Sequence, residues 1–392
     1  MVDAIDRTRD YRGGRATACR RASNAVLVAL FTAIISLPLA ANIAGHDGAD
    51  AQAENRELAP LPQFDAAPAS IVDYAGALGR WFEDHFGFRA TLVRWYAESR
   101  FFWLDVSPSP SVIKGRDHWL FYADDGGVED YTNEAPLSGA ALDDWRETLV
   151  RTRDWLRARG IAYVFTMPPD KHVIYPEQMP STLRRMHAES RSDQIDAVCA
   201  RVGVADVDVR PAMAAAKTRE RIYFQTDTHW NDRGALLAYQ QILDAVRAQV
   251  PSTPAAWTCA EFRRVTRDVE ALDLAGMMGL KRVLREQDLV LVPARPRLAR
   301  VVEPAGAEPT AEEGRLVTEI PGSRLPRALI FRDSFASRLV PFLSEHFSRA
   351  VYLWQNDFDA NAVLSENPDV VIQEIVGRHL YNFIPSPELV PQ

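Results

Sequence analysis

After residue 160, the hydrophobic residues of this chain form short, nearly continuous runs. Five such runs lie at Ile161–Met167, Val204–Val209, Arg327–Ser334, Arg349–Trp354 and Asp369–Val376. The segments between them carry apolar residues at helical spacing. Short apolar strands that alternate with helices are typical of a parallel sheet covered on both faces. The pattern predicts an α/β fold, a flavodoxin-like doubly wound sandwich, with ligands bound at the C-terminal ends of the strands.

The predicted helices are bounded by ordinary start and stop signals, such as Ser before a periodic run and Gly after it. They are expected from Ser138 to Gly160, from about Ser190 to Arg201, after Trp230, from about Ala336 to Phe347, and near Ala360.

Three further segments lie outside this alternation. Ile71–Leu104 is aromatic and helical in period, with a break near Gly87, and Val112–Asp125 predicts two strands that turn around Gly115. Cys259–Arg324 interrupts the alternation and predicts a small β insertion, whose place in the fold stays open.

The N-terminus predicts a membrane span. Residues 22–45 contain no charged side chain, which is long enough for a helix to cross a hydrocarbon core. Six arginines precede this run and carboxylates dominate after it, so the chain should run from the cytoplasm outward. A cleaved signal peptide with the site Ala51–Ala53 is the alternative, but its apolar core is usually shorter, so we favour an uncleaved anchor kinked at Pro38. The expected layout is a cytoplasmic terminus (1–21), an anchor (22–45), a tether (46–68) and one large domain (69–392).

Composition narrows the functional class. Hydrophobic residues make up 47% of the chain and charged residues 25%, which is typical of a globular protein. The formal net charge of -8 argues against a general nucleic-acid binder. Neither a Walker loop, nor GxGxxG, nor a zinc-type cysteine cluster occurs. Of the three cysteines, Cys199 and Cys259 would be exported, where they can either pair or remain two separate buried thiols.

Two short motifs carry candidate chemistry. In "LIFRDSF", Ser334 follows an apolar strand and precedes a helix, where a hydroxyl projects from the strand end, although a plain helix cap has the same pattern. In "TDTHW", Asp227 and His229 stand two residues apart, which in an extended segment places both on one face. A serine needs a neighbouring base that is held in one tautomer. The sequence thus offers Asp227 as orienter, His229 as base and Ser334 as nucleophile.

Other interpretations of the same residues stay open. Asn231 or Asp232 is expected to cap the helix behind "TDTHW", and His229 and Asp227 can be a packed histidine and a second cap. A metal site would need a third ligand, and although Asp170 and His172 are available, nothing marks them as ligands. We therefore predict no metal.

"TDTHWNDRGA" followed by "FRDSF" resembles the AlgX/AlgJ-type alginate O-acetyltransferases, a branch of the SGNH-hydrolase superfamily. "ENRELAPLPQF", "WFEDHFGFRATLV", "SPSVIKGRDHWLFY", "PPDKHVIYPE" and "VVIQEIVGRHLYN" resemble further segments of that family. The resemblance covers most of the chain beyond the apolar run, and an N-terminal anchor before an exported catalytic domain is similar to the AlgJ-type members.

The resemblance implies a triad of Asp227, His229 and Ser334 that transfers acetyl groups to an exopolysaccharide through an acetyl-serine intermediate. It implies a single-pass protein of the bacterial inner membrane with its catalytic domain in the periplasm. The implied partners are the polysaccharide acceptor, a membrane-bound O-acyltransferase that supplies acetyl groups, and other exopolysaccharide assembly proteins. No soluble cofactor is implied.

The chain departs from the superfamily at the nucleophile, where Arg332 stands in place of the usual Gly of Gly-Asp-Ser. Arg332, Arg378 and Tyr381 are the candidates for oxyanion or substrate contacts, and a C-terminal packing helix is the alternative role for the last two. An acetylesterase acting through the same triad, and a non-catalytic subunit of an assembly complex, remain the rival functions.

Overall fold

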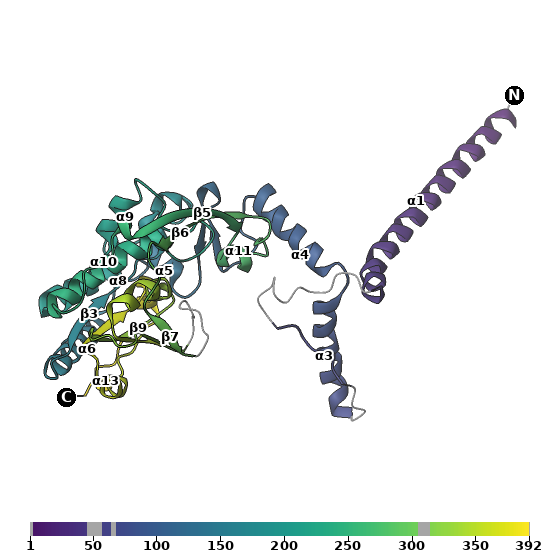
Figure 1. Ribbon diagram of the computed structural model, residues 1–392. Coiled ribbons are helices and arrows are strands. Elements are labelled where there is room, and N and C mark those ends of the chain that lie inside the picture. The colour runs from purple at the N-terminus through teal and green to yellow at the C-terminus, as the bar shows by residue number, and fades with distance from the viewer. Residues whose placement is uncertain (1–2, 45–56, 64–67, 305–313, 392) are drawn as a thin grey trace. The chain divides into compact units, whose positions relative to one another are not determined.

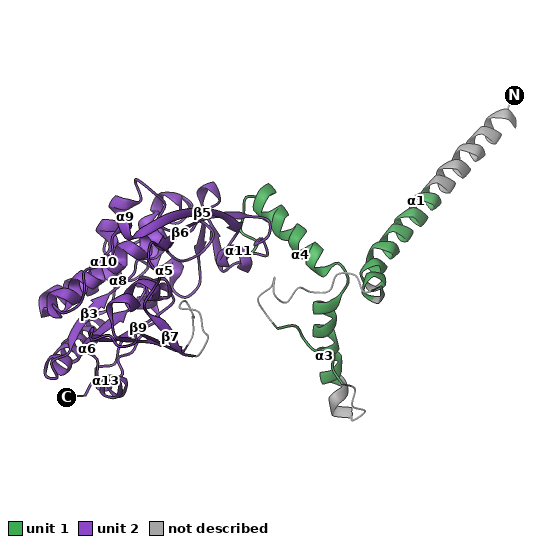
Figure 2. Ribbon diagram, in the orientation of Figure 1, with its two compact units in different colours: residues 1–108 green, residues 109–392 purple. Residues whose placement is uncertain are grey.

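The computed structural model describes residues 3–44, 57–63, 68–304 and 314–391. It divides the chain into two compact units, Met1–Pro108 and Ser109–Gln392 (Figure 2). Each unit is described by itself below. Residues 69–108 of the predicted domain 69–392 fall in the N-terminal unit, and the predicted domain layout stays a prediction.

The N-terminal unit consists of helices α1 (Asp3–Ile43), α3 (Pro68–His85) and α4 (Arg89–Glu98), and the π-helical turn η1 (Ser99–Trp103). The aromatic segment is therefore helical, with the break at Gly87 that the sequence predicts. Among the described residues, one stretch, Arg20–Asn42, is long and apolar enough to cross a membrane, with a mean hydropathy of 2.1. A signal sequence near the N-terminus can meet the same criteria of length and hydropathy, so this stretch is weak evidence for an anchor. Most of the predicted tether lies outside the described residues.

The C-terminal unit is built on a seven-stranded sheet with the order β4-β3-β11-β9-β10-β8-β7. The five predicted apolar runs form β3 (Ala162–Thr166), β4 (Ala205–Val207), β9 (Arg327–Arg332), β10 (Arg349–Trp354) and β11 (Val370–Glu374). All five are parallel to their neighbours within this group. Two strands from the unplaced segment, β7 (Arg300–Glu303) and β8 (Arg315–Glu319), extend the sheet in antiparallel fashion, so the sheet as a whole is mixed.

The strand order differs from that of flavodoxin. Numbered along the chain, the five parallel strands lie in the order 2-1-5-3-4 instead of 2-1-3-4-5, because β11, the last strand, is inserted between β3 and β9. The consequence for the site is direct. The segments that follow β3, β11 and β9 leave the sheet side by side at its C-terminal edge.

Helices cover both faces, as predicted (Figure 1). On one face, α6 (Gly139–Arg157), α8 (Arg191–Val202) and α13 (Ala360–Glu366) pack on Phe165 and Phe331. On the other face, α10 (Asp232–Gln249) and α12 (Val340–Leu343) pack on Val164 and Ile330. Neighbouring residues of one strand enter opposite clusters because side chains alternate across a sheet. Ser138 and Ser190 cap α6 and α8 as the sequence predicts.

The helix predicted from Ala336 to Phe347 is broken into three short pieces. A 3-10 turn η5 (Phe335–Arg338), α12 and a second turn η6 (Ser344–His346) follow one another. Pro341 lies at the start of α12, where its missing N–H is tolerated.

The segment that the sequence left unplaced also supplies a long hairpin. Strands β5 (Phe262–Glu270) and β6 (Arg285–Pro293) pair antiparallel along their full length, apart from the main sheet. Near Gly115, β1 (Val112–Lys114) and β2 (Leu120–Tyr122) form a second small sheet, as predicted. Cys199 is buried and Cys259 is exposed, and both are free thiols, so the pairing alternative is wrong and only one of the two thiols is buried.

The start of α10 requires a glycine at position 234. A Cβ added there would lie 2.4 Å from the carbonyl oxygen of Ile222 and 2.8 Å from the Cβ of Trp230. Two backbone segments therefore approach each other at the point where the loop containing His229 enters the helix. Only the absence of a side chain permits this contact.

We expect Gly234→Ala to lower the free energy of unfolding by about 2 kcal/mol or more, because the added methyl group has no space to occupy. Chemical denaturation measures the loss. Gly276→Ala is the matched control, since nothing lies within 4 Å of its added Cβ. The control should be neutral or stabilise by up to about 1 kcal/mol. Equal stability of both variants would contradict the packing described here.

Candidate active site

Asp227 and His229 lie in a loop of bends that is closed at its base by an isolated bridge between Tyr223 and Trp230. Asp227 Oδ1 accepts hydrogen bonds from His229 Nδ1 at 2.8 Å and from the His229 backbone N–H at 3.0 Å. The sequence correctly predicts that the two side chains are adjacent, but for the wrong reason. An Asx-type turn joins them, not the alternation of an extended strand.

Asp227 is a stable carboxylate in this setting. Burial by itself would raise its pKa, but the hydrogen bonds and charge of His229 lower the pKa to about 2. A fixed negative charge at Nδ1 keeps the proton on that nitrogen and leaves Nε2 as the basic one. Nε2 of His229 is buried and accepts no hydrogen bond from any described residue.

The helix that follows Asp227 and His229 in the chain, α10, begins as predicted. Asn231 Oδ1 accepts hydrogen bonds from the N–H groups of Arg233 and Gly234, so Asn231 is the N-cap. Asp232, the other candidate, instead accepts hydrogen bonds from Arg338 Nη1 and the Leu291 N–H. The latter bond joins α10 to β6.

A buried lysine holds the backbone of the loop that contains Asp227 and His229, which we call the dyad loop. Lys171 is only 3% exposed, and its Nζ donates to the carbonyl oxygens of Phe224 (3.0 Å), Gln225 (3.2 Å) and Asp227 (2.5 Å). An ammonium group has three donors, and here each donor meets a backbone acceptor. Burial lowers the pKa of Lys171 to about 7, against the opposing fields of Asp227 and Glu286.

A buried carboxylate holds the same loop from the other side. Glu286, on β6, is 1% exposed, and its Oε2 accepts hydrogen bonds from the N–H groups of Gln225 and Thr226 and from the Thr226 hydroxyl. Arg221 pairs with its other oxygen at 2.6 Å. The β5–β6 hairpin therefore acts as a support for the dyad loop, a role that its sequence does not reveal.

Ser334 is half-buried and stands between the end of β9 and η5, where its side chain caps nothing. The next residue links it to the dyad. The rings of His229 and Phe335 lie 5.0 Å apart, and Trp230 Nε1 donates to the Phe335 carbonyl oxygen at 3.1 Å. The tertiary structure thus brings the dyad loop against the residue that follows Ser334, although the two segments are over a hundred residues apart.

The turn that carries Ser334 is fixed by buried carboxyl groups. Asp333 accepts hydrogen bonds from the N–H of Phe335 at 2.9 Å and from that of Val376 at 2.7 Å, and donates its own N–H to Glu374 at 2.8 Å. Burial, together with the nearby Asp333 charge, raises the pKa of Glu374 well above its usual range. A protonated Glu374 can sit beside Asp333 without placing two negative charges together.

Arg332 occupies the position where the superfamily has glycine, and it is fully buried. Its Nη1 donates to Ser337 Oγ at 2.8 Å and to the Asp333 carbonyl oxygen at 3.3 Å, and its guanidinium lies 4.7 Å from the centre of the Trp354 ring. These buried contacts stabilise the turn that carries Ser334.

Arg378 joins the ends of β3 and β11. Its Nη1 donates to Asp170 Oδ1 at 2.7 Å, and its backbone N–H donates to Asp170 Oδ2 at 3.0 Å. Its guanidinium lies 5.6 Å from the centre of the Phe335 ring, and its Nε is 3.5 Å from Asp125. Arg378 therefore reaches the Ser334 turn. Tyr381, the third sequence candidate, stacks against Arg191 and has a buried hydroxyl with no partner among the described residues.

His379 lies between two carboxylates, and sequence reasoning missed it. Its Nε2 is 2.9 Å from Asp125, and its Nδ1 is 3.6 Å from Asp333. Burial opposes a charge on this ring, but the hydrogen bond to Asp125 and the Asp333 charge outweigh burial and raise the pKa of His379. The only available signal was its position in "GRHLYN", directly after a predicted strand end.

Asp130, Asp170 and His172 offer three potential metal ligands within 4.8 Å of one another. Their geometry does not favour a metal, because each already has a partner. His172 Nε2 is 2.8 Å from Asp130, and Asp170 binds the cationic Arg378. The expectation of a metal-free site stays a prediction.

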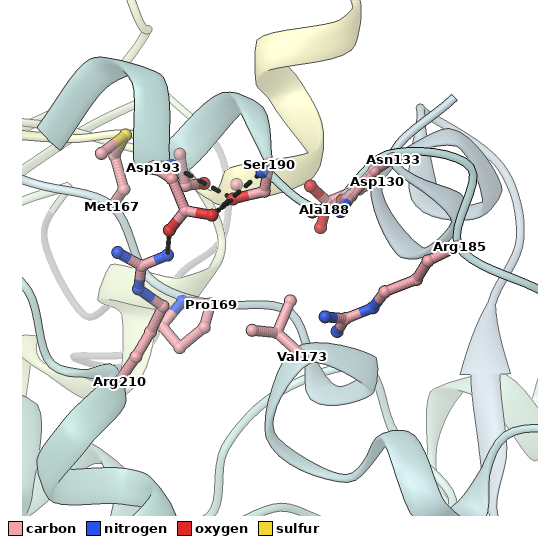
Figure 3. A pocket seen from close by; sticks show the side chains of 12 residues that line it. Asp130, Asn133, Met167, Pro169, Val173, Arg185, Ala188, Ser190, Asp193 and Arg210 are labelled. Carbon is pink, nitrogen blue, oxygen red and sulfur yellow. Dashed lines mark hydrogen bonds and ion pairs between the residues drawn. The ribbon is translucent and has the colours of Figure 1, made fainter. Parts of the chain in front are cut away.

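A cavity of about 200 Å³ opens beside this cluster, lined by residues from the ends of β3 and β11 and from the start of α8. Figure 3 shows Asp193 paired with Arg210 on one side, while Arg185 reaches toward Val173 on the other. Asp130, Asn133 and Ser190 complete a polar lining. Such a lining suits hydroxylated ligands better than apolar ones.

A family profile described as an SGNH hydrolase-like domain of the acetyltransferase AlgX matches residues 112–357, more than half of the chain. The probable alginate O-acetylase AlgJ of Pseudomonas syringae pv. tomato is 30% identical over 147 residues, which are 36% of this chain and 35% of that protein. Its counterpart in Pseudomonas aeruginosa is 28% identical over 196 residues, 48% of this chain and 47% of that protein. The chain thus aligns with between a third and a half of the length of these relatives.

Two solved structures match the chain at low sequence identity. The O-acetyltransferase domain of Pseudomonas putida AlgJ has a TM-score of 0.46 and 20% identity, covering 69% of this chain and 92% of that one. PatB1 of Bacillus cereus has a TM-score of 0.48 and 17% identity, covering 68% of this chain and 95% of that one.

Replacing the buried lysine should destabilise the dyad loop. We expect Lys171→Met to lower the free energy of unfolding by about 3 kcal/mol, because three buried carbonyl oxygens lose their charged donor. Lys281→Met, at an exposed position, makes the same chemical change and should alter stability by no more than about 0.5 kcal/mol. Urea denaturation compares the two variants.

The pH dependence tests the same site. With a pKa of about 7 when folded, Lys171 binds fewer protons in the native chain than in the unfolded chain between about pH 7 and the ordinary lysine pKa near 10.4. Stability therefore rises with pH across that window. The stability difference between the wild type and Lys171→Met should widen there and stay constant below it. A stability difference that stays constant across the window would show that the folded lysine remains charged there.

Proposed function

The chain belongs to the SGNH hydrolase-like family of the acetyltransferase AlgX, and from this premise we propose that it transfers acetyl groups to hydroxyls of an exopolysaccharide. Ser334 is the nucleophile, His229 the general base and Asp227 the group that orients the base. The names of its relatives point to an alginate-like acceptor.

One observation carries this proposal. His229 has a carboxylate at Nδ1 and a buried, unbonded Nε2, and its ring packs on the residue next to Ser334. A buried polar atom without a partner is costly, so an unpaired Nε2 favours a functional over a purely structural role for His229. The empty acceptor at Nε2 is what a base needs in order to take a hydroxyl proton.

The first half-reaction loads the serine. Ser334 Oγ attacks the acetyl carbonyl carbon of the donor while its proton passes to His229 Nε2, and the Oγ–C bond forms. The tetrahedral intermediate collapses with cleavage of the donor's bond to the acetyl group. The departing donor atom then takes the proton from Nε2, which leaves acetyl-Ser334 and a neutral His229.

The second half-reaction reverses these roles. A sugar hydroxyl gives its proton to His229 Nε2 and attacks the acetyl-serine carbonyl carbon. The Ser334 Oγ–C bond breaks, and Oγ recovers the proton. Asp227 stabilises the imidazolium in both steps without itself becoming protonated, in accord with its low pKa.

Of the three candidates for oxyanion or substrate contacts, Arg378 is best suited to the acyl group. Its guanidinium approaches Phe335, and its Nε is ion-paired with Asp125 at 3.5 Å but forms no hydrogen bond with any described residue. Arg332 is committed to the interior of the turn, so we assign it a positioning role. Tyr381 is available for substrate contacts through its unpaired hydroxyl.

We place the reaction in the periplasm, at the surface of the bacterial inner membrane, with α1 as a single-pass anchor. A membrane-bound O-acyltransferase would hand over the acetyl group, and other exopolysaccharide assembly proteins would deliver the polymer. An acetylesterase is the second candidate, because the same acyl-serine reacts with water when no glycan is in place. The unpaired Nε2 weighs against a non-catalytic subunit.

An assay that separates these functions gives the full-length protein, in detergent, an acetyl-ester donor with and without oligosaccharide. Acetylated glycan supports transfer, acetate alone supports an esterase, and the absence of both contradicts the triad. Ser334→Ala should lower turnover at least about a thousandfold. Ser365→Ala, on the exposed side of α13, is the matched control and should keep full activity.

The cavity beside Arg378 is the proposed acceptor subsite. We expect Arg185→Ala to raise KM for the oligosaccharide about fivefold while kcat stays within about twofold, because the side chain would bind substrate without touching the reacting atoms. Arg184→Ala removes a neighbouring exposed arginine that does not line the cavity. Equal KM values for the two variants would exclude this subsite.

A further inference from the structure

The C-terminal end of α1 packs against the corner between α3 and α4. The Gly87 N–H donates to the Pro38 carbonyl oxygen at 3.1 Å, and the Asn42 side chain donates to the His85 carbonyl oxygen. Contact is so close that a Cβ on Gly87 would lie 2.5 Å from that of Ala41. The corner is therefore joined to the last turn of the apolar stretch Arg20–Asn42.

Beyond that corner, α4 and η1 expose an unusual number of large apolar side chains. Trp103 is 85% exposed and Trp95 is 62% exposed. The remaining members of this aromatic surface are Leu92, Val93, Tyr96, Phe102 and Leu104. Single exposed apolar residues are ordinary, but this many within one short segment indicate an interaction site.

Arginines are interspersed with these side chains. Arg94 is about half exposed. Arg100 donates a hydrogen bond to the Tyr96 hydroxyl at 3.0 Å, and its guanidinium lies 5.5 Å from the centre of the Tyr96 ring. Arg89, at the first position of α4, donates to the Glu83 carbonyl oxygen. Trp and Tyr are enriched where protein meets lipid headgroups, and Arg, like them, has an apolar body and a polar end that suit this layer.

We propose that the aromatic surface of α4 and η1 lies in the headgroup layer of the same bilayer that α1 crosses. The inference rests on α1 being a membrane anchor, as proposed above. If α1 spans the bilayer, the end near Asn42 emerges at the membrane surface, and the contacts of Gly87 hold the start of α4 at that depth. Tryptophan rings can then enter the acyl boundary while the arginines meet phosphates.

This arrangement has a functional consequence. In this arrangement α1 crosses the bilayer and α4 lies on its surface. The segment that follows η1 and leads to the C-terminal unit would therefore start from the headgroup layer.

The test uses the full-length chain reconstituted in phosphatidylethanolamine–phosphatidylglycerol vesicles, with phospholipids brominated close to the headgroup. Bromine quenches tryptophan fluorescence only at near contact. We expect a quenched component in the wild type that falls by more than half in the double variant Trp95→Phe/Trp103→Phe. Trp257→Phe, in the C-terminal unit and nearly buried, is the matched control and should leave the quenched component unchanged.

Two failures can be told apart. If alkaline extraction removes the chain from the vesicles, the anchor is wrong, and the inference that depends on it falls as well. If the chain stays in the vesicles but the double variant is quenched as strongly as the wild type, the anchor stands. The aromatic surface then lies outside the headgroup layer, and this inference is overturned.

Discussion

A buried lysine and a buried glutamate hold the loop on which the proposed chemistry depends. Lys171 donates to its carbonyl oxygens and Glu286 accepts from its N–H groups, so the backbone around Asp227 is fixed from both directions. Each charge would be costly alone, but the loop supplies the partners that make its burial tolerable. This constraint positions the imidazole of His229 more rigidly than the short Asx turn could achieve by itself.

The turn that carries Ser334 is likewise held by buried charged groups. Asp333 joins the end of β9 to the segment after β11, and Arg378 joins that segment to the end of β3 through Asp170. Insertion of β11 between β3 and β9 makes both links short. The turn that carries Ser334 is thus held by charged cross-links between neighbouring strands. This explains how the chain accommodates Arg332 where the superfamily has glycine, since the guanidinium becomes one more of these links.

Much of the fold could be predicted from the sequence because its signals are local. The five apolar strands, the caps Ser138, Ser190 and Asn231, and the break near Gly87 each depend on residues within a few positions of one another. The helix after Ser334 was predicted less well, because Pro341 and the packing of its short turns divide it. Asp227 and His229 were found together because two residues suffice to form their hydrogen bond.

The sequence by itself determined the strands, the helix starts and the presence of an Asp–His pair and a serine at a strand end, since each is encoded by neighbouring residues. Only the tertiary structure decided the position of β11, the supporting role of the β5–β6 hairpin and the meeting of Phe335 with His229. It also revealed His379 between Asp125 and Asp333. These contacts join residues that are far apart in the chain, and their partners are chosen by burial and charge pairing, which no local pattern records.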